Sequence, residues 1–239
     1  MSRSKGKRNF LSYKNYNRSR SGSEPLFSKN TPFVEEEVRE YERKRYRGWD
    51  QKLVDKREQR ILEKILHQTG LDWGKVLDVP CGYGRFSSLF ERRGFSLLQC
   101  DLSFPMVKRA RDQRRKGACC WGVVADIKNP LPFQSSSVAL VLSMRFFHHV
   151  HHRREREHIL REFFRVSGKW VVISFYRRNF LHFLQRKFRK KIKESPTRIS
   201  MIPEKSFNQE LQKEGFRLKR IYPLFKGLHA QHIALLEKV

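Results

Sequence analysis

From residue 75 onward, short apolar runs alternate with segments of helical pattern to the end of the chain. The predicted strands are 76–80, 96–100, 120–125, 138–143, 170–175, 216–222 and 231–237, and the predicted helices are 85–93, 104–116, 153–166 and 204–214. Strands that alternate with helices form a parallel sheet covered on both faces. We therefore expect an α/β fold with a Rossmann-like, doubly wound sheet of about seven strands.

The last two predicted strands have no helix between them. A parallel pair needs a crossover connection, so these two strands must pair antiparallel. The sheet is then mostly parallel with an antiparallel last strand. The chain length of 239 residues fits one large domain, which we place at residues 71–239.

Two segments precede this domain. Residues 1–23 hold seven Lys or Arg and no acid, so residues 1–33 are predicted to be a basic, disordered tail. An arm for an anionic partner and an organelle transit peptide are the alternatives. Residues 34–70 have a helical pattern, with a helix predicted over 51–69 that ends at Gly70 and packs on the core.

The formal net charge is +28, which favours anionic partners such as nucleic acid, phosphorylated metabolites or an acidic membrane surface. No apolar run is long enough to predict a transmembrane helix. The four cysteines, Cys81, Cys100, Cys119 and Cys120, have no zinc-site spacing and indicate buried thiols in a reducing compartment. We expect a cytoplasmic protein, with peripheral binding at a membrane surface left open.

The carboxyl ends of the predicted strands carry the candidate site. Gly82 and Gly84 follow the first strand, where glycine lets the backbone turn tightly and approach a ligand, and a helix from near Arg85 points its amides at the pocket. Asp101 ends the second strand and is positioned to accept hydrogen bonds from ribose hydroxyls. Asp126 follows the third strand. A typical dinucleotide site needs only the acid after its second strand, so this third acid is informative.

These stretches resemble four successive motifs of class I methyltransferases that use S-adenosylmethionine (SAM), in the branch of methyltransferase type 11 and quinone-biosynthesis enzymes. The matching stretches are Asp78-Val-Pro-Cys-Gly-Tyr-Gly84, Asp101-Leu-Ser-Phe-Pro-Met106, Ala125-Asp-Ile127 and Leu142-Ser-Met-Arg-Phe-Phe-His-His149. The resemblance implies SAM as cofactor. The implied SAM-binding residues are Asp78, Pro80, Cys81, Gly82, Gly84, Arg85, Asp101, Leu102, Met106, Asp126, Ile127, Ser143 and Met144.

The resemblance also limits the catalytic residues that are needed. SAM carries its own leaving group, so the protein mainly has to align the acceptor, and a general base is required only if the acceptor loses a proton. His148 and His149 are the candidate bases, with packing or lining of the SAM pocket as the alternative. No metal is expected, because no cysteine or carboxylate lies near these histidines at ligand spacing.

The segment 177–193 has eight Lys or Arg, no acid, and apolar residues at every fourth position. We interpret 177–200 as a basic, amphipathic insertion. It could cover the acceptor site, lie on an acidic membrane surface, or follow a phosphate backbone.

Three functions remain open at this stage. The first is methyl transfer to a small-molecule or lipid-linked acceptor, which the resemblance of the fourth strand favours. The second is RNA methylation, which the basic charge favours. The third is a non-catalytic binding module that keeps the fold. Ser137-Val-Ala-Leu140 departs from the pattern, since many relatives have an acid there, which leaves the subfamily open.

Overall fold

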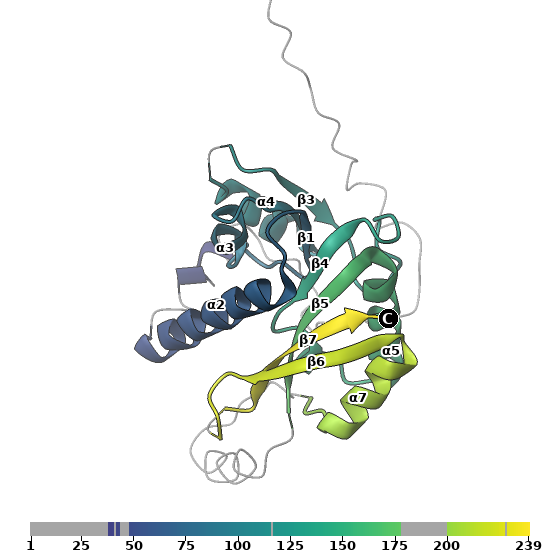
Figure 1. Cartoon of the computed structure of the whole chain (residues 1–239). Helices are drawn as coiled ribbons and strands as arrows, with labels where there is room; N and C mark the ends of the chain where they lie inside the picture. Colours follow the sequence, from purple (N-terminus) through teal and green to yellow (C-terminus); the bar gives the residue numbers. More distant parts are fainter. Residues whose placement is uncertain (1–37, 41, 44–47, 116, 178–199, 228) are drawn as a thin grey trace, which may run out of the picture. The chain divides into compact units, whose positions relative to one another are not determined.

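Seven strands form a single sheet in the order β3-β2-β1-β4-β5-β7-β6 (Figure 1). Their bounds are β1 (Lys75–Asp78), β2 (Ser96–Asp101), β3 (Cys120–Val124), β4 (Val138–Ser143), β5 (Ser167–Tyr176), β6 (Phe216–Pro223) and β7 (Gln231–Lys238). Strands β1 to β5 are parallel, and β7 is antiparallel to both of its neighbours, β5 and β6. The predicted sheet and its antiparallel last strand are confirmed.

This computed structural model describes residues 38–40, 42–43, 48–115, 117–177, 200–227 and 229–239. All of them belong to one compact unit, Pro32–Val239. The predictions for the basic tail over 1–33 and for the amphipathic segment over 178–199 fall outside the described residues. No helix in the described part of the chain is long and apolar enough to cross a membrane.

Helices cover both faces of the sheet. They are α2 (Trp49–Thr69), α3 (Ser87–Glu91), α4 (Phe104–Asp112), α5 (Arg153–Val166) and α7 (Glu204–Lys213), with a short 3-10 helix, η2 (Phe147–His149). Residues of α5 and α7 share one apolar cluster with Leu77 and Val141, and residues of α2 and α3 share another with Val76 and Leu140. Neighbouring residues on a strand thus enter opposite clusters, as the two-residue period of a strand requires.

Helix α2 confirms the helix predicted over 51–69. Ile61, Leu62, Ile65 and Leu66 recur at helical spacing, and all four are buried. Gly70 ends the helix in the left-handed conformation with φ at 65°, and its N–H donates to the carbonyl of His67. Glycine adopts this conformation at low cost, which explains why the helix stops there.

Two helices are shorter than predicted. The helix expected over 85–93 extends only over Ser87–Glu91, and the helix expected over 104–116 ends at Asp112. Gly82 and Gly84 have φ of 53° and 81°, and the turns that they form continue to Phe86. Arg85 therefore lies in a loop, and the helix predicted to begin near it begins two residues later, at Ser87.

Candidate functional site

The sheet order brings the predicted site residues to one edge. Strands β3, β2, β1 and β4 are consecutive neighbours and parallel, so their carboxyl ends lie side by side. Asp78, Asp101 and Ser143 are the last residues of β1, β2 and β4, and Asp126 follows β3. Four segments separated in the sequence thus contribute to one site.

The loop after β1 holds two glycines with different roles. A Cβ on Gly84 would meet the Cα and Cβ of Ala110 on α4 at 2.9 Å, so close packing excludes a side chain. A Cβ on Gly82 would meet nothing within 4 Å. Gly82 therefore faces open space, where a ligand could approach the backbone. The N–H of Cys81 donates to the carbonyl of Cys100 at 2.8 Å, which ties the loop to β2.

Asp101 connects the loops after β1 and β2. Its Oδ2 accepts a hydrogen bond from the N–H of Gly82, and its Oδ1 accepts one from the N–H of Ser103, both at 2.9 Å. Burial raises the pKa of Asp101, although these backbone donors oppose the shift. The next residue, Leu102, is an apolar side chain with 42% of its surface exposed. A carboxylate beside an exposed apolar side chain suits a ligand with both hydroxyls and a flat ring.

The other two acids at the strand ends occupy different surroundings. Asp78 is buried, and burial raises its pKa to about 8, with Arg85 lowering it and Asp101 raising it further. Asp126 is partly exposed and accepts hydrogen bonds from the N–H of Lys128 at 2.9 Å and from Nδ2 of Asn129 at 3.2 Å. Asp126 thus organises the turn after β3.

Near the methyl-donor motif, Ser143 and Met144 are buried at the end of β4. Ser143 Oγ has no hydrogen-bond partner in the part of the chain that the structure describes. Pro80 follows a cis peptide bond, and Ile127 is buried in the cluster that contains α5 and α7. These placements agree with a lining role without testing it.

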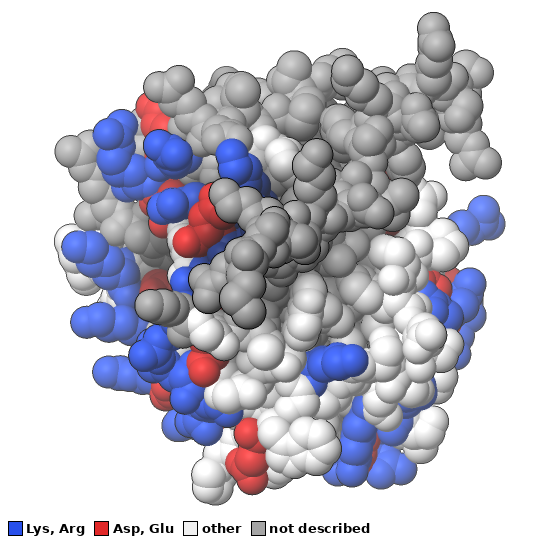
Figure 2. Space-filling view, turned by 90° about the horizontal axis from the view of Figure 1, so that it is seen from above, with Lys and Arg blue, Asp and Glu red and all other residues white. Residues whose placement is uncertain are grey.

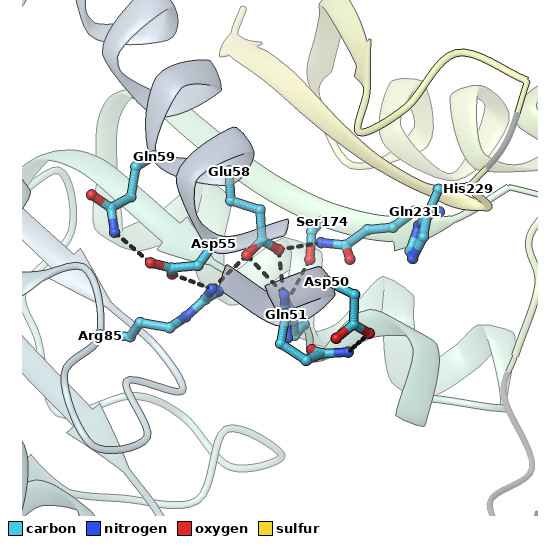
Figure 3. A network of polar contacts seen from close by, with 10 residues as sticks. Asp50, Gln51, Asp55, Glu58, Gln59, Arg85, Ser174, His229 and Gln231 are labelled. Atoms are coloured by element: carbon cyan, nitrogen blue, oxygen red, sulfur yellow. Dashed lines mark hydrogen bonds and ion pairs between the residues drawn. The ribbon is translucent and has the colours of Figure 1, made fainter. Parts of the chain in front are cut away.

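A buried carboxylate that the sequence analysis missed lies at the same edge. Glu58 on α2 is fully buried. It accepts hydrogen bonds from Arg85 Nη1 at 2.5 Å, from Arg145 Nε and Nη2 at 2.9 Å each, and from Gln231 Nε2 at 2.5 Å. Figure 3 shows Glu58 pointing from α2 toward Arg85 on one side and Gln231 on the other. One side chain therefore connects α2 to the ends of three strands, β1, β4 and β7.

The charges around Glu58 balance. Burial acts to raise its pKa, but Arg85 and Arg145 outweigh that effect and hold the pKa below its ordinary value. Arg85 also pairs with Asp55 at 2.8 Å, so two arginines face two carboxylates. A signal for Glu58 existed in the sequence: it is an acid on the apolar side of the helical pattern, one turn before Ile61 and Leu62.

The two candidate bases lie beside further ring side chains. The rings of His148 and His149 have centroids 3.9 Å apart, and His148 lies 4.7 Å from the ring of Tyr176 on β5. Tyr176 in turn lies 6.1 Å from the ring of His229, which precedes β7. We call His148, His149, Tyr176 and His229 the imidazole–phenol cluster. Only His148 and His149 could be predicted from the sequence, because Tyr176 on β5 and His229 before β7 are distant along the chain.

The start of the described chain covers part of the site. Val38 is buried in a small cluster with Tyr83, from the loop after β1, and with Met106 of α4. Glu42 accepts hydrogen bonds from Arg109 Nε at 2.8 Å and from Gln113 Nε2 at 2.9 Å. The predicted helical segment before the domain thus contacts the loop that carries the glycines.

Comparison with known proteins agrees with this geometry. The family model described as a methyltransferase domain matches residues 77–172. A malonyl-[acyl-carrier protein] O-methyltransferase of Hamiltonella defensa is 33% identical over 113 residues, which is 47% of this chain and 41% of that protein. The enzyme of the same name from Salmonella typhimurium is 44% identical over 46 residues, 19% of this chain and 18% of that protein. The matches span less than half of these relatives.

Solved structures share the fold over a larger part of the chain. The magnesium protoporphyrin IX methyltransferase of Synechocystis, solved with bound SAH, has a TM-score of 0.68 and 17% identity, over 84% of this chain and 94% of that one. A SAM-dependent methyltransferase of Methanosarcina mazei has a TM-score of 0.61 and 19% identity, over 73% of this chain and 97% of that one. At this identity the likeness shows the fold alone.

Proposed function

We propose that the chain is a class I SAM-dependent methyltransferase, which binds SAM and transfers the methyl group to a small-molecule or lipid-linked acceptor; the match to a methyltransferase domain over residues 77–172 and the shared fold support this. The observation that carries the proposal is the open loop at Gly82, held by the carboxylate of Asp101 at the carboxyl edge of the sheet. Bound SAM supplies an activated methyl group on a sulfonium. The residues of this chain have to hold SAM and align the acceptor.

The residues present fit SAM. The empty space at Gly82 leaves room for a ligand against the backbone, and the carboxylate of Asp101 is within reach of hydroxyls placed there. The exposed side chain of Leu102 offers an apolar surface for an adenine ring. Asp126, at the end of the next strand, would lie near the adenine amino group. These roles are parts of the proposal.

On the acceptor side, the imidazole–phenol cluster offers groups that can hold or accept a proton. His149 is partly exposed and its ring lies tilted against that of the buried His148, which makes His149 the better candidate for a base that contacts the acceptor. The curated relatives are named as O-methyltransferases, which supports an acceptor oxygen. An oxygen acceptor that carries a proton needs such a base, whereas a carboxylate acceptor does not.

Calorimetry with SAM and with SAH tests the proposal directly. We expect wild-type protein to bind both ligands, and Asp101→Ala to weaken binding by roughly 1.5–3 kcal/mol, the scale of hydrogen bonds to a charged group. Asp72→Ala, which removes an exposed acid away from the carboxyl edge, is the matched control and should bind like wild type. Folded wild-type protein that binds neither ligand would contradict the proposal.

We also propose that the protein works in a reducing compartment such as the cytoplasm. Cys81, Cys100 and Cys120 are free and buried, as predicted, whereas Cys119 is exposed. Burial raises the pKa of the Cys100 thiol to about 12 and that of the Cys120 thiol to about 11, so both remain protonated at neutral pH. An exposed free thiol at Cys119 supports an environment that keeps thiols reduced.

A further inference from the structure

Helix α2 presents a row of cations on its exposed side. Lys52, Lys56, Arg60 and Lys64 are all exposed and follow one another at four-residue intervals. Residues four apart lie one above the other on a helix, about 6 Å apart along its axis. The row therefore extends over about 18 Å of α2. We call these four residues the cationic stripe.

Two large apolar side chains continue the stripe toward the start of the helix. Trp49 is 81% exposed and Leu53 is 45% exposed. Trp49 is seven residues before Lys56, and Leu53 is three before Lys56 and seven before Arg60, so they lie on the same side of α2. Glu58 and the apolar residues Ile61, Leu62 and Ile65 occupy the opposite side, which packs on the sheet. The helix thus has one side committed to the core and one side without a protein partner among the described residues.

Glu63 lies on the same side of α2, three residues after Arg60, but no described ion pair joins it to the stripe. The side chains of Lys52, Lys56, Arg60 and Lys64 make no ion pair or hydrogen bond with any described residue. Some cations elsewhere are matched by acids, such as Arg156 by Glu210, Arg161 by Glu214, and Arg165 by Glu162. The three ion pairs of α2 among the described residues all involve Asp55 or Glu58 and not the stripe. The outer side therefore attracts an anionic surface.

We propose that this side of α2 docks the protein on an anionic lipid bilayer. Cations beside exposed Trp and Leu are the composition of helices that lie at a membrane interface, where the cations meet lipid phosphates and the apolar side chains enter the headgroup region. Nucleic acid fits less well, because Leu53 has no ring to stack on bases and gains free energy only by leaving water. Figure 2 shows that Lys and Arg gather along the flanks of the described surface, where they outnumber the acids between them.

Docking on this side would bring the site close to the bilayer. Glu58 lies across the helix from the stripe and contacts the loops after β1 and β4, so about one helix diameter, roughly 10 Å, separates the bilayer from the edge that carries the site. An acceptor carried on a lipid could then reach the site without leaving the membrane. This consequence rests on the proposed function, whereas the docking itself does not.

Co-sedimentation of the full chain with phosphatidylcholine vesicles, with and without phosphatidylglycerol, tests the docking. We expect binding only to vesicles that contain phosphatidylglycerol, and weaker binding at higher salt because salt screens charge. The triple variant Lys56→Ser, Arg60→Ser, Lys64→Ser should bind on the order of 100-fold more weakly, from about 1 kcal/mol for each cation near the surface. Trp49→Ser with Leu53→Ser should weaken the binding that remains at high salt.

The matched control is Lys75→Ser, Arg92→Ser, Arg93→Ser, which removes the same charge from exposed positions at the amino edge of the sheet. It should bind vesicles like wild type. An equal loss in both triple variants would overturn the proposal, because net charge alone would explain the binding. So would a stripe variant that loses affinity for a single-stranded RNA oligonucleotide but keeps its vesicle binding. SAM calorimetry on each variant keeps this result separate from that of the proposed function.

Discussion

At the scale of single residues, Glu58 links helix α2 to the carboxyl edge of the sheet, which carries the candidate site. A carboxylate without cations would be strongly destabilising in its fully buried position. Arg85 and Arg145 supply that compensation, and each comes from a loop that follows a strand of the site. The N–H of Arg145 also donates to Ser174 Oγ at 2.5 Å, which fixes the loop after β4 against β5. The positions of both loops therefore depend on one side chain.

We predict that Glu58→Gln lowers the free energy of unfolding by about 3–5 kcal/mol, because Arg85 and Arg145, both largely buried, lose their shared carboxylate partner, and Asp55 stays only with Arg85. It should also weaken SAM binding roughly tenfold, since displaced loops hold the ligand poorly. Thermal unfolding and calorimetry measure the two effects.

Glu210→Gln is the matched control for this prediction. Glu210 is also buried and pairs with both Nε and Nη2 of Arg156, at 2.9 and 2.7 Å, but it connects α7 to α5. It should lose similar stability while SAM binding stays unchanged. Equal SAM affinity in the two variants would show that the Glu58 contacts serve stability alone. Glu58→Gln combined with Arg145→Gln, which removes one of the two cations that Glu58 pairs with, should recover part of the stability.

Asp78 makes stability depend on pH. Its pKa is about 8 in the folded protein, because burial disfavours the charged form, against 3.8 ordinarily. Between about pH 4 and pH 8 the carboxyl is protonated in the folded protein and ionised in the unfolded chain. Its contribution to the free energy of unfolding is therefore fully present below pH 4 and is lost as the pH rises through 8. We predict that wild type loses stability relative to Asp78→Asn over this range, by up to about 1.4 kcal/mol per pH unit. Denaturant unfolding at several pH values measures this difference, and a constant difference would contradict the pKa.

At the scale of elements, the two glycines of the loop after β1 have different roles, one in packing and one at the candidate binding surface. Gly84 touches α4, and Gly82 faces open space. We predict that Gly84→Ala destabilises the protein by about 1–3 kcal/mol, because its Cβ overlaps Ala110. Gly82→Ala should cost about 1 kcal/mol from its positive φ alone, and it should lower SAM affinity more strongly. Unfolding and calorimetry on both variants decide between these roles. If Gly84→Ala lowered SAM affinity more than Gly82→Ala does, the ligand would have to bind elsewhere.

Element types and most element bounds could be predicted, because they depend on local periodicity. The strand over 138–143 and the helix over 153–166 match β4 and α5 residue for residue. The prediction was wrong where loop geometry overrides propensity. The apolar residues after Gly84 favour a helix, but the two positive φ angles delay it to Ser87.

At the scale of the whole molecule, the formal net charge of +28 opposes folding through repulsion between cations. Acids are outnumbered, and exposed cations such as Lys56, Arg60 and Arg92 have no ion pair in the described part of the chain. We predict that adding sodium chloride up to about 0.5 M raises the unfolding temperature, because the Debye length falls well below 10 Å. Sucrose of matched osmolarity is the control for non-ionic effects. An unfolding temperature that falls with salt would mean that attractive ion pairs dominate.

The sequence by itself determined the α/β class, the antiparallel end of the sheet, and the acids and glycines at the strand ends, since each of these depends on neighbouring residues. Asp101, Gly82 and Gly84 could be identified because the ligand loop of this fold is continuous in sequence. Their roles toward SAM stay predictions until binding is measured.

Only the tertiary structure decided which distant residues meet. Glu58 reaches Arg145 across 87 positions and Gln231 across 173, and no local pattern encodes such a separation. Tyr176 and His229 join His148 because β7 inserts between β5 and β6, which brings the start of the last strand to the carboxyl edge. The physical reason is that a buried charge or ring is satisfied by whatever the packing of the sheet brings near it, and that packing is a property of the whole chain.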